Sequence, residues 1–213
     1  VFSEFRPDIH IREVEWSIGS PVYLCVDPGY AGAYAVELVQ EINGQVIVFD
    51  EIYEQGLITE QIVDICMTRP WWKDVAGGAI DIAGTQHQAM AAPAEVWQKR
   101  GSVNLHSQKV RINEGIERLK SFLKPNPLNG VPSLVVSPRC RGLLSEVGAA
   151  PNPFDGQTRV YRWKMDNNGQ VVGETPEDKN NHGVKALTYW LVDRFGFARD
   201  SRKQVVKVLY HSR

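Results

Sequence analysis

Hydrophobic and polar residues along the first quarter of the chain follow the pattern of successive strands. The run VYLCV (residues 22–26) is apolar without interruption, which is typical of a strand buried on both faces, and it ends at Asp27. Residues 33–41 and 46–53 alternate between apolar and polar side chains, and Asn43-Gly44 between them is a strong hairpin signal. The pattern predicts an antiparallel meander of three strands.

Helix-like and strand-like patterns then follow one another along the rest of the chain. This order, with an acid at the end of the first strand, fits an RNase H-like α/β fold. We expect a mixed central sheet, made of the meander and parallel strands, flanked by helices and carrying an added β-hairpin. The expected helices run from Thr59 to near Pro70 and over residues 93–100, 112–123, 138–147 and 182–195; the expected strands cover 75–81, 103–105 and 133–137, with the hairpin at 158–165 and 170–173.

The composition, 43% hydrophobic and 23% charged, is that of a soluble globular protein. A net charge of −1 gives no overall basic field to attract nucleic acid, although a local basic face is compatible with it. No apolar stretch approaches the roughly 18 residues of a membrane span and no signal peptide is present, so no membrane association is expected. Cys25, Cys66 and Cys140 are widely spaced and odd in number, which predicts reduced thiols in a cytosolic compartment.

The start of the chain leads us to expect a piece of a longer protein. The chain begins at Val1, and its first twenty residues are irregular. We predict that residues 1–20 are a linker from a missing N-terminal domain, that residues 21–197 form the folded domain and that residues 198–213 are a basic tail. No G-x-x-x-x-G-K-[ST] loop occurs, so this piece has no P-loop ATPase chemistry of its own.

Two aspartates each close an apolar strand. Asp27 ends the first strand, and the apolar run 75–80 ends in Asp81. An aspartate after a strand is commonly a turn or cap residue. If the two strands are neighbours, however, the carboxylates lie near one another at one edge of the sheet, since paired strands are about 4.8 Å apart. Like charges that close require a divalent cation or a raised pKa, so the pair favours a shared metal site.

His182 opens the last expected helix, after a polar loop that contains Asp178. A lone histidine is usually a helix-end or surface residue, but this position also suits a metal ligand, and an imidazole shifts preference toward Mn²⁺ over Mg²⁺. In the second hairpin, Arg162 and Lys164 share a face whereas Arg159 points the other way. That face is either solvated surface or a ribbon that follows DNA phosphates.

Two further groups are interpreted as structural. Trp71-Trp72 is expected in the core or in an apolar patch, with a base-stacking platform as the less favoured alternative. Asp50 and Glu51 on the third strand are expected to be charges of an edge strand.

Several segments, taken in order, carry a family resemblance: VYLCVDPGY, AIDIAGTQHQ, EVWQKRG, LVVSPRCRGLLSEV, YRWKMDNNGQ and NNHGVKALTYWLVDRFG. The set covers about residues 15–197 and resembles the C-terminal nuclease domain of the large terminase subunit of tailed bacteriophages. That family has an RNase H-like fold related to Holliday-junction resolvases, and it cuts concatemeric viral DNA during packaging. The resemblance implies an endonuclease that uses one or two Mg²⁺ or Mn²⁺ ions to activate water for attack on the phosphodiester.

The resemblance also implies roles for individual residues. Asp27 corresponds to the first catalytic aspartate, Asp81 to the second acid and His182 to the histidine of the final motif. That motif often carries an aspartate three residues after the histidine, and here the position is Lys185. An ammonium at this place would repel a second cation or take part of its position, and Asp178 is the candidate replacement ligand.

The implied partners are double-stranded DNA and, in the full-length protein, an ATPase domain, the portal and the small terminase subunit, all in the host cell cytoplasm during viral assembly. One alternative is a catalytically degenerate module that clamps DNA or docks on the portal, with Lys185 marking a lost metal site. A second alternative is one lobe of an actin-like ATPase. Such a lobe needs hydroxyls in the loop after the first strand, and residues 28–32 (PGYAG) lack Ser and Thr.

Overall fold

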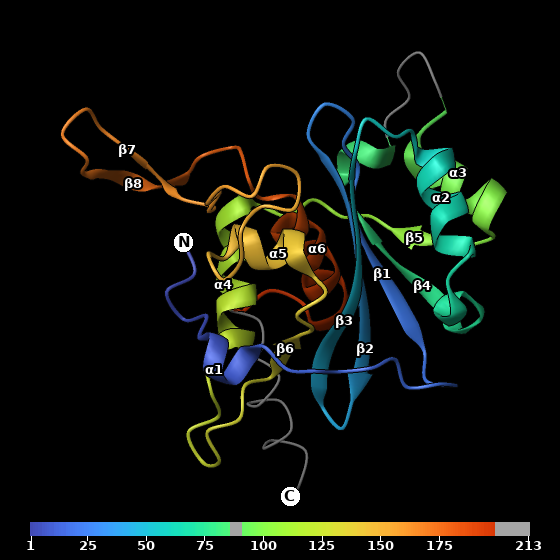
Figure 1. Ribbon diagram of the computed structural model, residues 1–213, viewed down its shortest axis with the longest axis horizontal. Helices are drawn as coiled ribbons and strands as arrows, with labels where there is room; N and C mark the ends of the chain where they lie inside the picture. Colours follow the sequence, from blue (N-terminus) through green and yellow to red (C-terminus); the bar gives the residue numbers. More distant parts are fainter. Residues whose placement is uncertain (86–90, 199–213) are drawn as a thin grey trace, which may run out of the picture.

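The computed structural model describes residues 1–85 and 91–198. A six-stranded mixed sheet with the strand order β5-β4-β1-β2-β3-β6 runs through its centre (Figure 1). The strands are β1 (Val22–Asp27), β2 (Ala33–Ile42), β3 (Gln45–Gln55), β4 (Val75–Ile80), β5 (Leu105–His106) and β6 (Leu134–Val136).

The first three strands form the antiparallel meander that the sequence predicts. Asn43 and Gly44 connect β2 to β3 with φ of 51° and 75°, the left-handed values that a tight two-residue hairpin turn requires. The later strands are added in parallel: β4 pairs with β1, β5 with β4, and β6 with β3. The carboxyl ends of β1 and β4 therefore meet at the same edge of the sheet.

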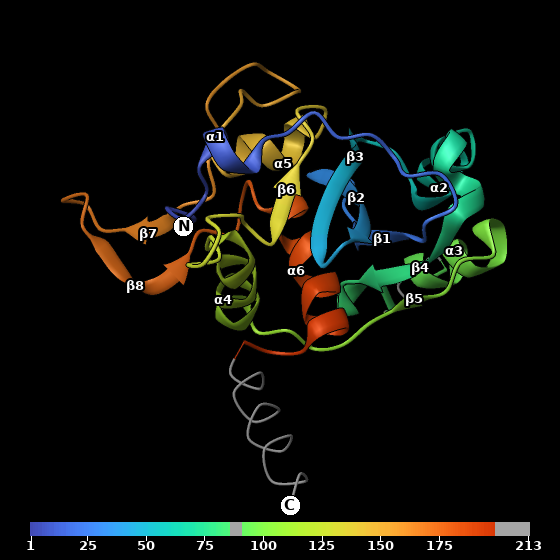
Figure 2. The same cartoon turned by 90° about the horizontal axis from the view of Figure 1, so that it is seen from below.

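Helices cover both faces of the sheet, as expected (Figures 1 and 2). One face carries α4 (Ile112–Leu123), α5 (Arg141–Glu146) and α6 (His182–Phe195), and the short α1 (Pro7–His10) lies beside β6. The other face carries α2 (Thr59–Met67), α3 (Pro93–Gly101) and the 3-10 helix η1 (Pro70–Asp74). A second 3-10 helix, η2 (Ile82–Thr85), follows β4.

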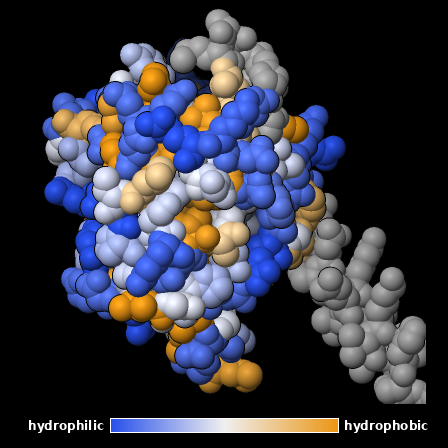
Figure 3. Space-filling model, turned by 90° about the vertical axis from the view of Figure 1, so that its right-hand side faces the viewer, coloured by the Kyte–Doolittle hydropathy of each residue, from blue (hydrophilic) through white to orange (hydrophobic). Residues whose placement is uncertain are grey.

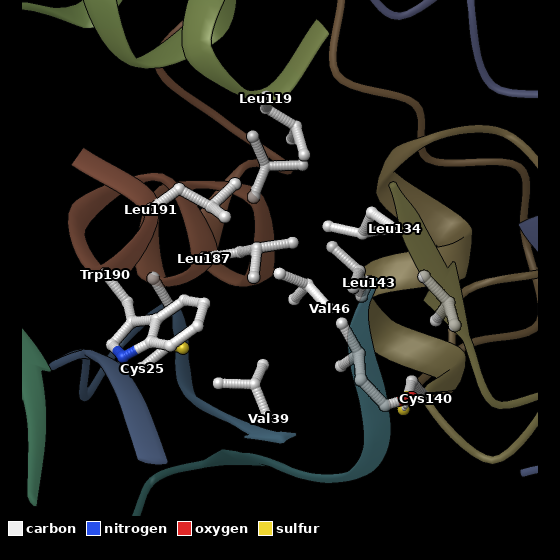
Figure 4. Close-up of a cluster of buried hydrophobic side chains, with 14 of the residues drawn as sticks. Cys25, Val39, Val46, Leu119, Leu134, Cys140, Leu143, Leu187, Trp190 and Leu191 are labelled. Atoms are coloured by element: carbon white, nitrogen blue, oxygen red, sulfur yellow. Dashed lines mark hydrogen bonds between the residues drawn. The ribbon is translucent and has the colours of Figure 1, made fainter. Parts of the chain in front are cut away.

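A hydrophobic core fills each side of the sheet. On the α6 side, Leu187, Trp190 and Leu191 pack toward Cys25 and Val39 of the sheet (Figure 4). On the other side, Trp71 is buried at 3% exposure, which confirms its expected place in the core. Figure 3 shows the surface over α2 and α3, where hydrophobic side chains form small separate patches among polar ones, an ordinary protein surface.

The second hairpin consists of β7 (Trp163–Met165) and β8 (Val171–Pro176), which extend away from the main body (Figures 1 and 2). Its first strand begins at Trp163 and not at residue 158 as expected. The reason is that Tyr161 is buried in the core and its backbone N–H donates to Glu146 O, 2.9 Å away. The preceding segment is therefore held to the main body instead of pairing with β8.

The expected role of Asp50 and Glu51 as edge-strand charges is wrong, although β6 pairs only with residues 46–48 of β3. The two carboxylates have specific partners. Asp50 Oδ2 accepts a hydrogen bond from Trp71 Nε1 at 2.8 Å, and Glu51 accepts two from backbone N–H groups of α5.

The segment 1–20 packs against the domain. Phe2 and His10 are buried, and His10 Nε2 lies 2.8 Å from Leu123 O. Its origin as a linker stays a prediction, and the predicted tail lies outside the described residues except for residue 198. No helix within residues 1–85 and 91–198 combines the length and apolar character needed to cross a membrane.

Candidate active site

Asp27 and Asp81 lie next to one another at the carboxyl edge of the sheet, as the sequence predicts. Val26 of β1 is opposite Ile80 of β4 in the parallel register, so the residue after each of them shares the edge. Asp81 extends this pairing, because its backbone N–H donates to Val26 O at 3.2 Å. Asp27 is 5% exposed, and its carboxyl group is thus enclosed by the protein.

His182, the first residue of α6, reaches the same place. Its Nδ1 lies 2.8 Å from Asp27 Oδ2. The other ring nitrogen faces the loop after β1, where a Cβ built on Gly32 would lie 2.7 Å from His182 Nε2. Any side chain at position 32 would therefore displace the imidazole, so the pairing of His182 with Asp27 depends on this glycine.

The pKa values of Asp27 and His182 both lie above their ordinary values, for different reasons. Burial raises the pKa of Asp27, and the hydrogen bond from His182 opposes this only in part. Burial alone would lower the pKa of His182, but the hydrogen bond to Asp27 and the negative charge of Asp27 outweigh it and raise the pKa. The hydrogen bond to Asp27 thus favours the protonated imidazole, whereas the burial of Asp27 disfavours its charged form.

One face of α6 points at the site, since residues three and four apart on a helix are neighbours. Lys185 follows His182 on this face, and its positive charge lowers the pKa of Asp27. Tyr189 comes one turn later, and burial together with the negative charges of Asp27 and Asp81 raises the pKa of its phenol. Tyr189 was not among the residues that we expected from the sequence, although its helical spacing from His182 and Lys185 was visible there.

Asp178 is held beside Lys185 and not against Asp27. Its Oδ1 lies 2.8 Å from Lys185 Nζ and accepts a second hydrogen bond from Asn181 Nδ2 at 3.3 Å. The bond from Lys185 holds the pKa of Asp178 below its usual range. The Asp178 side chain is 80% exposed, so it lies at the solvent side of the site.

The basic residues of the hairpin are separate from this cluster. Arg162 directly precedes β7, Lys164 lies within it, and both are exposed. The backbone N–H of Glu177 donates to Arg162 O at 2.9 Å. The base of the hairpin thus joins the loop that leads through Asp178 to His182.

The chemical types of these side chains suit a divalent cation. Mn²⁺ accepts two carboxylates and an imidazole as ligands, and carboxylates also suit Mg²⁺. The arrangement is closed, however, because Asp27 Oδ2 and His182 Nδ1 bind each other. In the part of the chain that the structure describes, no three His, Cys, Asp or Glu side chains are grouped so that they could hold a metal ion.

Comparison with known proteins gives fold neighbours only. No model of a protein family matches the sequence, and no curated protein matches it. The large terminase of a thermophilic bacteriophage matches with a TM-score of 0.67 and 14% identity, covering 91% of this chain and 44% of that one. The chain therefore spans less than half the length of that terminase.

Two isolated nuclease domains match over nearly their whole length. The nuclease domain of the SPP1 large terminase, with bound Mn, has a TM-score of 0.60 at 14% identity and covers 91% of this chain and 97% of that one. The large terminase nuclease of phage G20c, with bound magnesium, has a TM-score of 0.55 at 14% identity, covering 89% and 95%. The chain has the fold of a large terminase nuclease domain, an RNase H-like mixed sheet flanked by helices.

Proposed function

We propose that this chain is a divalent-metal-dependent DNA endonuclease domain that cuts concatemeric viral DNA during genome packaging. The observation that carries the proposal is the meeting of Asp27, Asp81 and His182 at one edge of a sheet with the terminase nuclease fold. Carboxylates on adjacent rigid strands are the framework that metal-assisted phosphodiester hydrolysis requires.

Asp27, Asp81 and His182 are the residues that would hold a Mg²⁺ or Mn²⁺ ion. When bound, the ion would supply Lewis acidity to the scissile phosphate and its attacking water. The chain's own residues prepare the site. His182 holds Asp27 through Nδ1, the phenol of Tyr189 lies close enough to feel the charges of Asp27 and Asp81, and the burial of Asp27 limits the access of bulk water to it.

Lys185 favours a site with one ion. Its ammonium lies on the same face of α6 as His182, and its charge already acts on the Asp27 carboxyl. A positive charge there raises the free energy of a second cation in the same space. We infer that Lys185 takes over part of the role of a second ion by binding a phosphate oxygen, while Asp178 holds the ammonium in place.

The substrate of the proposed reaction is double-stranded DNA. Arg162 and Lys164, at the base and first strand of the hairpin, are the proposed phosphate contacts outside the catalytic cluster. In a full-length terminase the domain would act with an ATPase domain, the portal and the small terminase subunit in the cytoplasm of the host cell.

Cleavage of supercoiled plasmid tests the proposal. The chain is incubated with Mn²⁺, Mg²⁺ or EDTA, alongside Asp27→Asn and Asp81→Asn variants whose folding is checked by circular dichroism. We expect nicked and linear DNA with either metal, none with EDTA, and a loss of at least about a hundredfold in both variants. Cutting that persists in EDTA or in both variants would falsify the assignment of the site.

The closed pair of Asp27 and His182, with Lys185 beside it, supports one alternative: a degenerate nuclease that clamps DNA without cutting it. A clamp would bind DNA equally well with and without divalent metal. The same samples, analysed by gel shift with Mn²⁺ and with EDTA, separate the two functions. Metal-independent binding together with intact plasmid would favour the clamp.

A further inference from the structure

A group of carboxyl side chains lies beneath the first turn of α6, away from the solvent side of the candidate site. Glu146, at the end of α5, is 1% exposed. Its Oε1 lies 3.1 Å from Gly183 N and its Oε2 lies 2.8 Å from Val184 N, so the carboxylate accepts hydrogen bonds from the two residues that follow His182. The first N–H groups of a helix have no partner within the helix, and Glu146 supplies one from a different element.

Two neighbours hold the Glu146 carboxylate in place. Tyr53 of β3 donates its hydroxyl to Glu146 Oε1 at 2.8 Å. The positive end of the α6 dipole lies at the same carboxylate and favours its negative charge. Consistent with this, burial raises the pKa of Glu146, whereas the N–H groups of Val184 and Gly183 and the Tyr53 hydroxyl oppose that rise.

Glu37 of β2 lies on the other side of the same turn. It is 0% exposed, and a Cβ built on Gly183 would lie 2.6 Å from Glu37 Oε1 and 3.4 Å from Glu146 Oε2. Only glycine at position 183 lets the turn approach both carboxyl groups. The backbone that carries His182 is thus enclosed on two sides by buried acids.

Glu37 is paired with Glu51, which lies directly opposite on β3. As a carboxylate, Glu37 meets no hydrogen-bond donor among the described residues, so a charge there would be unsolvated. Glu51 instead accepts hydrogen bonds from Gly142 N at 2.8 Å and Leu143 N at 2.7 Å. Burial and the negative charges of Glu51 and Glu146 raise the pKa of Glu37 well above its ordinary value, which favours the protonated form of Glu37.

The buried acids do not form a second metal site, since no suitable group of three ligands occurs within residues 1–85 and 91–198. Their backbone partners give them a different role. Glu51 holds the start of α5, Glu146 at the end of α5 holds the start of α6, and α6 begins with His182. Of the two acids, only Glu146 contacts the first turn of α6, and Tyr53 of β3 links it to the sheet.

We propose that Glu146 is a positioning residue: by binding the N–H groups of Gly183 and Val184, it fixes the first turn of α6 and thereby the imidazole of His182 against Asp27. The metal-binding consequence of this positioning rests on the proposed function, but the positioning of the ring does not. Glu146 would not touch the metal ion itself, but would hold the backbone of the residues that follow the ligand His182. Loss of such an indirect contact typically weakens metal binding 10–100-fold.

The test compares Glu146→Ala, Glu146→Gln and Tyr53→Phe with a matched control, Glu51→Gln. Glu51 also binds two helix N–H groups from within the same group, but they belong to the start of α5, at the opposite end of that helix from Glu146. The first readout is the pair of ¹⁵N ring shifts of His182 in metal-free protein, measured by long-range ¹H–¹⁵N NMR and assigned by their loss in His182→Ala. The second is Mn²⁺ affinity, measured by electron paramagnetic resonance.

We expect Glu146→Ala to move the His182 Nδ1 signal away from its Asp27-bonded position and to weaken Mn²⁺ binding at least about tenfold. Glu146→Gln, which keeps one acceptor, and Tyr53→Phe should shift the same signal by less and in the same direction. If Glu146→Ala does not fold, the His182 signals of Glu146→Gln and Tyr53→Phe test the proposal instead. Glu51→Gln should leave the His182 signals and Mn²⁺ affinity within about twofold of the parent.

Unchanged His182 signals in the folded Glu146 variants, with a loss of stability like that of Glu51→Gln, would overturn the proposal, because Glu146 would then only support the fold. Failure of the proposed function gives a different result. In that case the parent chain itself would neither bind Mn²⁺ nor cut DNA, while the ring shifts of the metal-free protein would still report on the positioning by Glu146.

Discussion

His182 and Asp27 are 155 positions apart in the sequence, and yet His182 Nδ1 lies 2.8 Å from Asp27 Oδ2. The contact joins the first residue of the last helix to the last residue of the central strand. It is made possible by α6 packing along the sheet through Leu187 and Leu191, which places the start of the helix at the edge where β1 and β4 end. The hydrophobic face of α6 therefore determines which polar groups meet at the site.

Gly32→Ala should damage the site without unfolding the domain. The added methyl group would lie 2.7 Å from His182 Nε2, and the imidazole would have to move away from Asp27 to make room. Because the clash is with one side chain near the surface, we expect a stability cost of about 1–2 kcal/mol. Mn²⁺ affinity should fall about 10–100-fold, measured by titration, with urea unfolding as the check on stability.

A double-mutant cycle provides the control for this prediction. In a His182→Ala background the imidazole is absent, so Gly32→Ala has nothing to displace and should be nearly neutral. Two residues in contact are expected to give such non-additive effects. Equal effects of Gly32→Ala in both backgrounds would show that the alanine acts through the loop and not through the histidine.

Much of the framework could be predicted because it depends on local pattern. The helices α4 and α6 have the expected bounds, 112–123 and 182–195, since each combines a clear apolar period with a polar segment before it. The adjacency of Asp27 and Asp81 also followed from sequence, because each ends an apolar run and parallel neighbours end at the same edge.

The remaining features of the fold and of the site depend on tertiary contacts between elements that are far apart in the sequence. Alternation over residues 158–162 looks like a strand, but Tyr161 is taken into the core beside α5 and the strand starts later. The sequence pattern places Glu51 on an edge strand, but α5, from much later in the chain, packs there and its backbone N–H groups bind the carboxylate. Tyr189 and Glu146 could not be assigned to the site, because periodicity gives the face of a helix but not what that face meets.

Glu37→Gln should make stability less dependent on pH. Burial, together with the charges of Glu51 and Glu146, raises the pKa of Glu37 well above its ordinary value, and the pKa of Glu51 is raised to about 7. The folded state thus keeps a proton that the unfolded chain releases above about pH 4.5. This contribution to stability is fully present below that pH and is lost as the pH rises through the folded-state pKa.

The glutamine amide of the Glu37→Gln variant cannot lose its proton, so the variant should be more stable than the parent at pH 8, by about 1–3 kcal/mol, and closer to it at pH 5. Urea unfolding at pH 5, 6.5 and 8 measures the difference. Glu54→Gln, at an exposed position of β3, is the matched control and should leave the pH dependence of stability unchanged. A uniform loss of stability at all three pH values in Glu37→Gln would contradict the protonation of Glu37 in the folded state.

Removal of the hairpin's basic side chains should weaken DNA binding without changing the metal site. Arg162 and Lys164 are exposed and distant in sequence from the carboxylates, so Arg162→Ala/Lys164→Ala should leave Mn²⁺ affinity and stability unchanged. If both contact phosphates, the slope of log affinity against log salt should become shallower by about 1.8, since each contact contributes about 0.9.

Lys99→Ala is the control for the hairpin variant. Lys99 is equally exposed but lies on α3, at the opposite side of the molecule from the hairpin (Figure 1). Its removal should leave the slope within about 0.3 of the parent. A shallower slope in Lys99→Ala and none in the hairpin variant would move the DNA path to the face that carries α3.

Lys185→Asp should convert the site from one ion to two. The substitution removes the ammonium that repels a second cation and places a carboxylate on the α6 face that carries His182, one turn away. Asp178 loses its contact with the ammonium at the same time and keeps only the longer hydrogen bond from Asn181, so it becomes available as a further oxygen ligand. Calorimetric titration with Mn²⁺ should give one site for the parent and two for the variant.

Lys185→Met separates the loss of positive charge from the gain of a ligand. Methionine keeps the length and apolar body of the side chain but supplies no carboxylate, so this variant should still bind one ion. If Lys185 contacts a phosphate oxygen, Lys185→Met should also cut plasmid more slowly at saturating Mn²⁺, by about tenfold, because one charge-assisted contact to the substrate is lost. Lys185→Asp should recover part of that rate at high Mn²⁺ concentration, since the second ion takes the position that the ammonium held. One Mn²⁺ in both variants, with plasmid cleavage unchanged in Lys185→Met, would mean that the ammonium serves only to hold Asp178.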